Sequence, residues 1–122
     1  MLLKLSKRVS PEVLLAYAAD VRWRKEVGGV LANGMALSTD RESQALITGA
    51  VTFLSNSPEG TAIQFKGPAG FVSLTRDELL PIALAVAGHV QACFAKEREV
   101  CAAISASPPT IFTHAQVDEA FA

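Results

Sequence analysis

Residues 22–44 read RWRKEVGGVLANGMALSTDRESQ and place a helix end, a hairpin and a helix start in direct succession. The basic residues within 22–25 suit a helix C-terminus, where cations meet unpaired carbonyl groups. Gly28-Gly29 is then expected to end the helix, because glycine adopts positive φ without a Cβ clash. Asn33-Gly34, between two short apolar runs, predicts a type I′ turn. This segment therefore predicts how a first helix, a hairpin and a second helix follow one another.

The second helix is expected to start at a capping box formed by Thr39 and Glu42. In such a box the hydroxyl and the carboxylate satisfy backbone N–H groups of the first turn. Behind it, apolar residues recur at helical spacing at Ile47, Ala50, Val51 and Leu54. A second box, Thr75 with Glu78, predicts a third helix from Arg76 to about Ser105, roughly 45 Å long.

The remaining elements follow from turn and cap signals along the chain. Residues 1–9 form a basic leader, and Ser10-Pro11 predicts the start of the first helix. A second hairpin is expected from strands 61–66 and 71–74, joined by the loop 67–70. After Pro108-Pro109, Thr113 is expected to cap a short terminal helix that runs to Phe121.

An offset of 36 positions places Gly34 over Gly70, Thr39 over Thr75 and Glu42 over Glu78. This pattern indicates either a duplicated hairpin–helix unit or two joints that converged on the same capping chemistry. In both cases the sequence predicts an α+β fold: a helix, then two β-hairpin–helix units forming one small antiparallel sheet packed on helices. We expect one domain over residues 1–122, with a core at about 12–105 and a tail at 106–122.

Composition limits the classes of partner. The chain has 122 residues, of which 50% are hydrophobic and 19% charged, with a net charge of -1. It has no basic cluster of the kind that neutralises phosphates, so we expect no nucleic-acid partner. Leu79–Ala95 carries no charged residue but contains Pro81 and falls short of the roughly 20 residues that a membrane span needs. We therefore expect a buried core helix and no membrane span.

One stripe of the third helix carries groups that bind zinc in other proteins, namely His89, Cys93, Glu97 and Cys101. A straight helix cannot wrap four ligands around one ion, because the ends of the stripe are about 18 Å apart. Neither His89 nor His114 lies in a nucleophile–base motif. The sequence therefore predicts no catalytic residue, no metal and no cofactor, and a small metal-binding or hydrolytic enzyme is a remote alternative.

A polar set around the first helix end is a candidate partner surface: Arg22, Trp23, Arg24, Glu26, Asp40, Arg41 and Gln44. The competing interpretation is an ordinary solvated helix end with surface ion pairs. Trp23 itself is expected to be a core anchor at the junction of helix and hairpin rather than a ligand platform.

Self-association is expected at the far end of the third helix. Val100, Cys101 and Ile104 lie beyond the charged segment Lys96–Glu99 and need apolar cover. A second copy of the chain would supply it, and we expect a homodimer or homotrimer with these three residues at the interface. The alternative is a monomer in which the tail folds back over them.

The segments RWRKEVGG (22–29) and TDRESQA (39–45) resemble an uncharacterised domain family of tailed bacteriophages and prophages. Further matching segments lie at 47–50, 65–66, 70–72 and 89–94, so the resemblance covers about residues 12–105. Pro81 and the tail from Ser107 depart from the family's pattern. The family occurs in tail proteins, often at the C-terminal end of tail-fibre chains, and no catalytic residues carry over from it.

The resemblance implies a non-enzymatic structural or interaction domain of a phage tail, with other tail proteins as partners. It would lie in the virion tail, or in the host bacterial cytoplasm during assembly. The alternative is an assembly factor that helps a tail fibre to fold and is absent from the mature virion.

Overall fold

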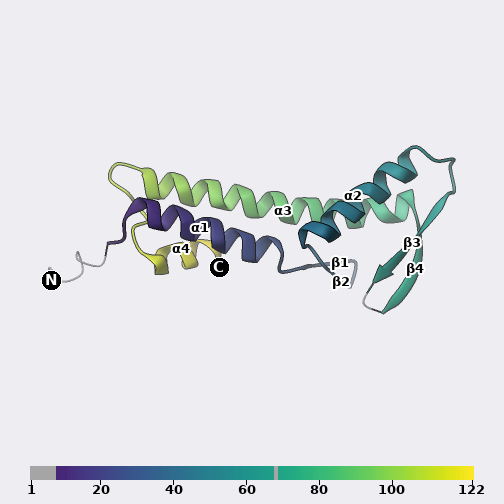
Figure 1. Cartoon of the computed structure of the whole chain (residues 1–122), viewed down its shortest axis with the longest axis horizontal. Coiled ribbons are helices and arrows are strands. Elements are labelled where there is room, and N and C mark those ends of the chain that lie inside the picture. The colour runs from purple at the N-terminus through teal and green to yellow at the C-terminus, as the bar shows by residue number, and fades with distance from the viewer. Residues whose placement is uncertain (1–7, 68) are drawn as a thin grey trace. The chain divides into compact units, whose positions relative to one another are not determined.

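The structure is a computed structural model that describes residues 8–67 and 69–122 (Figure 1). Its elements are, in order, α1 (Pro11–Glu26), β1 (Val30–Ala32), β2 (Met35–Leu37), α2 (Arg41–Ser55), β3 (Ala62–Gly67), β4 (Gly70–Thr75), α3 (Arg76–Ser105) and α4 (His114–Phe121). The α+β class and the order of elements are as predicted. Of the leader expected at 1–9, only Arg8 and Val9 are among the described residues.

Both hairpins are antiparallel, and the first has the predicted turn. Asn33 has φ 52° and Gly34 has φ 74°, as a type I′ turn requires, and Ala32 pairs with Met35. In the second hairpin Gly67 pairs with Gly70, while Pro68 of the predicted loop lies outside the described residues.

The hairpins form two separate two-stranded sheets, so the expectation of one shared sheet was wrong. The two hairpins share no hydrogen-bonded ladder, but side chains of both contact one apolar cluster. Val30 and Met35 of the first hairpin and Ile63 and Phe65 of the second pack against the same apolar cluster. Each hairpin therefore packs some of its apolar side chains on this cluster without pairing with the other hairpin.

The chain divides into two compact units, and each has its own apolar core. One unit contains the chain up to Lys25 together with Ala92–Ala122, and the other is Glu26–Gln91. The first core consists of Leu14, Ala18, Val21, Val100, Ile104, Val117 and Phe121. The second consists of Leu37, Ile47, Leu54, Leu79, Ile82 and Val86. The range predicted as one domain thus contains two cores.

The C-terminal segment covers the end of α3. Thr113 caps α4 as predicted, with its hydroxyl oxygen accepting the Gln116 N–H at 3.2 Å. Val100 and Ile104 are each only 2% exposed and belong to the same core as Val117 of α4. The apolar cover for which Val100, Cys101 and Ile104 were expected at an oligomer interface is therefore supplied to Val100 and Ile104 by the chain itself.

The start of α2 differs from the prediction, because Asp40 and not Thr39 is the N-cap. Its carboxylate accepts the Ser43 N–H at 2.7 Å. Thr39 is fully buried, and its hydroxyl donates to the Glu26 carbonyl at 2.6 Å while accepting the Gly29 N–H at 2.9 Å. The Thr39 hydroxyl, which the sequence predicted as the cap of α2, therefore bonds the end of α1 instead.

This cap gives a pH-dependent prediction. The backbone N–H of Ser43, followed by its hydroxyl, lowers the pKa of Asp40 from its ordinary value of 3.8. A carboxyl whose pKa is lowered by folding stabilises the fold above its unfolded pKa, and that contribution is lost as the pH falls through its folded pKa. We expect Asp40→Ala to lower the melting temperature at pH 7, and the difference from the parent chain to shrink below pH 3.8.

Thermal unfolding followed by circular dichroism, at neutral and at acid pH, measures this effect. The matched control is Glu42→Ala, which removes the carboxylate of the capping box that the sequence predicted. Equal losses from Glu42→Ala and Asp40→Ala at pH 7 would contradict the assignment of Asp40 as the cap.

Candidate functional site

Three of the seven residues in the expected partner surface meet in a polar cluster. Arg41 pairs with Glu26 through Nε to Oε2 at 2.5 Å and through a second guanidinium nitrogen to Oε1 at 3.1 Å. Gln44 Nε2 donates to Glu26 Oε2 at 3.0 Å. The Glu26 side chain is 1% exposed, whereas that of Arg41 is 62% exposed. The cluster is therefore an enclosed carboxylate that Arg41 contacts from the surface.

The backbone of Glu26 extends the same cluster. Its carbonyl oxygen accepts the Thr39 hydroxyl, and His89 Nε2 lies 3.1 Å from it. Gln44 Nε2 also donates to the Thr39 carbonyl at 2.7 Å. The end of α1, the start of α2 and the middle of α3 are thus tied to one residue. Because the carboxylate is enclosed and already bonded, the geometry suits holding the fold rather than binding a ligand.

The other members of the set have separate surroundings. Arg22 pairs with Glu97 at 2.8 Å and stacks on Phe94 at 4.4 Å from the ring centroid. Arg24 forms an exposed pair with Asp20 at 3.0 Å. Asp40 is occupied as the α2 cap. The partner surface expected from these seven residues stays a prediction.

Trp23 is 49% exposed, so the expectation of a core anchor was wrong. The core side of α1 is set by Leu14, Ala18 and Val21. Trp23 follows Val21 by two residues, which places it roughly 200° around the helix axis from that side.

The stripe of potential metal ligands is occupied by other contacts. His89 lies against the Glu26 carbonyl, Glu97 pairs with Arg22, and Cys93 is buried. Burial, and then the charge of Glu97, raise the pKa of Cys101 above its ordinary value. In the part of the chain that the structure describes, no three His, Cys, Asp or Glu side chains gather as a metal site would need.

The strongest candidate for a functional surface is an apolar groove between α2 and α3, in the unit Glu26–Gln91. Its volume is about 380 Å³. The walls carry no charged side chain, and Leu84 on the α3 wall is 69% exposed. The lining residues are Gln44, Ile47, Thr48, Val51, Thr52, Leu80, Ala83, Leu84, Val86, Ala87, Val90 and Gln91.

The groove lies on a helix that was expected to be buried. The most apolar 18-residue window of α3 has a mean hydropathy of 1.5, yet only 17% of it is buried. Only one side of Leu79–Ala95 packs in a core, through Leu79, Ile82, Val86 and Cys93, so the expectation of a buried helix was wrong for most of the stretch. By length and composition α3 also suffices to cross a membrane, which for a single helix is weak evidence. The expectation of no membrane span stays a prediction.

Comparison with known proteins adds one finding. Residues 10–121 match the model of a family described as "Domain of unknown function (DUF4376)". No curated protein and no solved structure matches the chain. The matched range extends past residue 105 and includes α4, whereas the resemblance noted in the sequence covers about residues 12–105.

Proposed function

The chain belongs to the DUF4376 family, whose function is unknown. We propose that it is a non-enzymatic interaction domain of a bacteriophage tail. It would bind an apolar segment of another tail protein in the groove between α2 and α3. The phage setting is supported by the resemblance of RWRKEVGG (22–29) and TDRESQA (39–45) to a domain of tail proteins.

The observation that carries the proposal is the uncharged groove with an exposed leucine on its wall. Apolar surface left in water costs about 25 cal/mol per Å², and contiguous exposed patches mark interaction sites. Leu80, Leu84 and Ala87 recur at helical spacing along the α3 wall, and Thr48 and Thr52 lie one turn apart on the α2 wall. Such walls suit the apolar face of a helix. The hydroxyls of Thr48 and Thr52 donate to the Gln44 and Thr48 carbonyls, so at the edge of the groove their oxygens can only accept hydrogen bonds.

The test compares two leucines of similar exposure in a phage or prophage that encodes this chain. Leu84→Glu places a charge in the groove, whereas Leu46→Glu, at a residue that is 67% exposed, places the same charge outside it. We expect Leu84→Glu to lower both the recovery of tail proteins on the tagged chain and the yield of infective particles by at least about tenfold. Leu46→Glu should leave both near the parent level.

Two outcomes would overturn the proposal: equal particle yields from the two folded variants, or recovery of proteins that do not belong to the tail. Mass spectrometry of purified virions then separates the two forms of the function. A structural tail component is present in the particle, whereas an assembly factor is missing from it.

The homo-oligomer expected from the sequence remains part of this proposal, with a changed location. Because Val100 and Ile104 are covered by their own chain, a second copy would contact the groove in place of these residues. Light scattering on the parent chain and on Leu84→Glu distinguishes a self-associating groove from one that binds only other tail proteins.

A further inference from the structure

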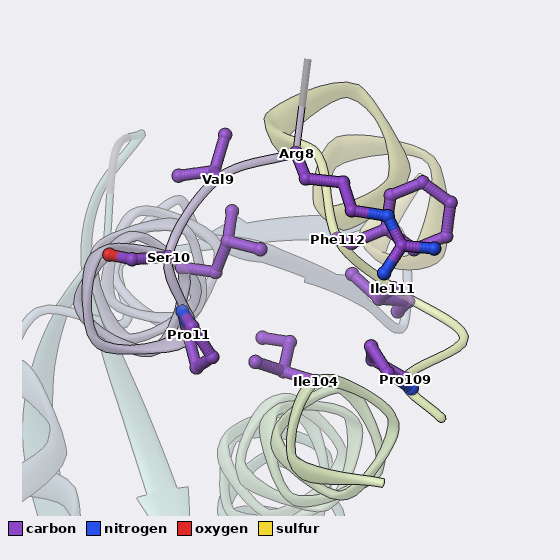
Figure 2. Close-up of a pocket in the computed structure, with 9 residues that line it drawn as sticks. Arg8, Val9, Ser10, Pro11, Ile104, Pro109, Ile111 and Phe112 are labelled. Carbon is purple, nitrogen blue, oxygen red and sulfur yellow. The ribbon is translucent and has the colours of Figure 1, made fainter. Parts of the chain in front are cut away.

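A second hollow lies in the other unit, where the start of α1 meets the end of α3 and the segment before α4 (Figure 2). Its volume is about 320 Å³. Two of its lining residues, Leu14 and Ile104, are buried, and most of the remaining wall is apolar. The lining residues are Arg8, Val9, Ser10, Pro11, Leu14, Ile104, Pro109, Ile111 and Phe112.

Backbone hydrogen bonds fix the walls of this pocket. The Val9 N–H donates to the Phe112 carbonyl at 2.9 Å, which joins the segment before α1 to the segment before α4. The Thr110 N–H donates to the Ala103 carbonyl at 3.0 Å, and the Phe112 N–H donates to Gln116 Oε1 at 2.8 Å. A ligand would therefore meet a preformed site, which reduces the ordering cost of binding.

Arg8 supplies the one charged side chain of the lining. Its guanidinium carbon lies 4.3 Å from the centroid of the Phe112 ring, and Figure 2 shows the two groups stacked beside Ile111. Stacking uses the face of the guanidinium and leaves its N–H edge available to an acceptor. Among the described residues Arg8 forms no ion pair. The positive end of the α1 dipole, at Pro11, lines the same pocket.

We propose that this pocket binds a carboxylate that carries a short apolar tail, with the tail against Ile104, Pro109 and Ile111 and the carboxylate on Arg8. Guanidinium matches a carboxylate in a two-point hydrogen-bonded geometry. At about 30 Å³ per water-sized group, the pocket holds roughly ten non-hydrogen atoms. The pocket lies in a different unit from the groove, so a test of carboxylate binding does not depend on the proposed function.

Octanoate is a suitable probe, because it has about this size and a single carboxylate. Titration followed by NMR should show saturable shifts at the backbone amides of Val9 and Phe112. Arg8→Gln should weaken octanoate binding by about tenfold, the effect of losing one charge-assisted hydrogen-bonded pair. Arg98→Gln is the matched control, since Arg98 is exposed on α3 and does not line the pocket.

Two further probes separate the apolar and anionic contributions. 1-Octanol should bind the parent chain more weakly than octanoate and should be unaffected by Arg8→Gln. Acetate, which lacks the tail, should give no saturable shift at the same concentrations. The proposal is overturned if octanoate gives no saturable shift at these amides, or if Arg98→Gln weakens binding as much as Arg8→Gln.

A peptide identifies the source of the carboxylate. A short peptide that ends in leucine with a free C-terminus is compared with its C-terminal amide. Tighter binding of the free acid than of octanoate, lost in Arg8→Gln, assigns the site to a protein C-terminus. Tighter binding of octanoate assigns it to a free small acid.

Discussion

Ile104→Ala is expected to lower the free energy of unfolding by about 3 kcal/mol. Ile104 is 2% exposed and shares a core with Leu14, Val100 and Val117. The substitution removes apolar atoms from water-free surroundings and leaves a cavity that neighbouring side chains fill only in part. Chemical denaturation, with the fraction folded followed by circular dichroism, measures the change.

The control is Ala102→Ser, an exposed position two residues earlier on α3, which should change stability little. Ile104→Glu separates the two accounts of this end of the helix. If Ile104 were at an oligomer interface, Ile104→Glu would give a folded monomer. Because the structure places Ile104 in the core, we expect loss of folding of the unit that contains α4. A folded Ile104→Glu monomer would contradict this placement.

Arg41→Ala is expected to cost about 3 kcal/mol, because it removes the guanidinium that contacts both oxygens of an enclosed carboxylate. The Glu26 side chain is 1% exposed, and Arg41 contacts both of its oxygens. Glu26→Gln should cost less, since a neutral amide needs no counter-charge and Arg41, at 62% exposure, is left in water. A larger loss of stability in Arg41→Ala than in Glu26→Gln is therefore the result that identifies Glu26 as the buried charge.

Denaturation of the two single variants and of the double variant Glu26→Gln/Arg41→Ala measures this coupling. The double variant should be more stable than the sum of the single losses predicts, because Arg41→Ala no longer leaves a buried charge. Arg24→Ala is the control, since Arg24 and Asp20 form an exposed pair of neighbouring helical turns that is expected to add little. Equal losses from Arg24→Ala and Arg41→Ala would refute the role of burial.

Some features of this chain follow from residues that are close together in the sequence. Asn33-Gly34 forms the predicted turn because its backbone angles depend on those two residues alone. The start of α1 at Pro11 and the cap of α4 at Thr113 are local for the same reason. The residues of the polar cluster were also grouped correctly in part, since Glu26, Arg41 and Gln44 do meet.

The sequence did not reveal either apolar hollow. The absence of charge from Leu79–Ala95 is consistent both with a buried helix and with an exposed apolar groove wall, and it does not distinguish the two. No local signal pointed to the Arg8 pocket, whose walls come from the two ends of the described chain. Pattern shows that a helix has an apolar side, but it does not show how much of that side a neighbouring element covers.

By itself, the sequence determined the class, order and bounds of most elements, because hydrogen bonds within turns, caps and helices join residues a few positions apart. Tertiary structure alone decided that Thr39 bonds the end of α1 instead of capping α2, and that Trp23 is exposed. It also decided that the hairpins form two sheets and that α4 covers Ile104. Each of these outcomes depends on which apolar surfaces far apart in the chain are buried together. Which surfaces are buried together depends on the packing of whole elements and not on the propensity of any one segment.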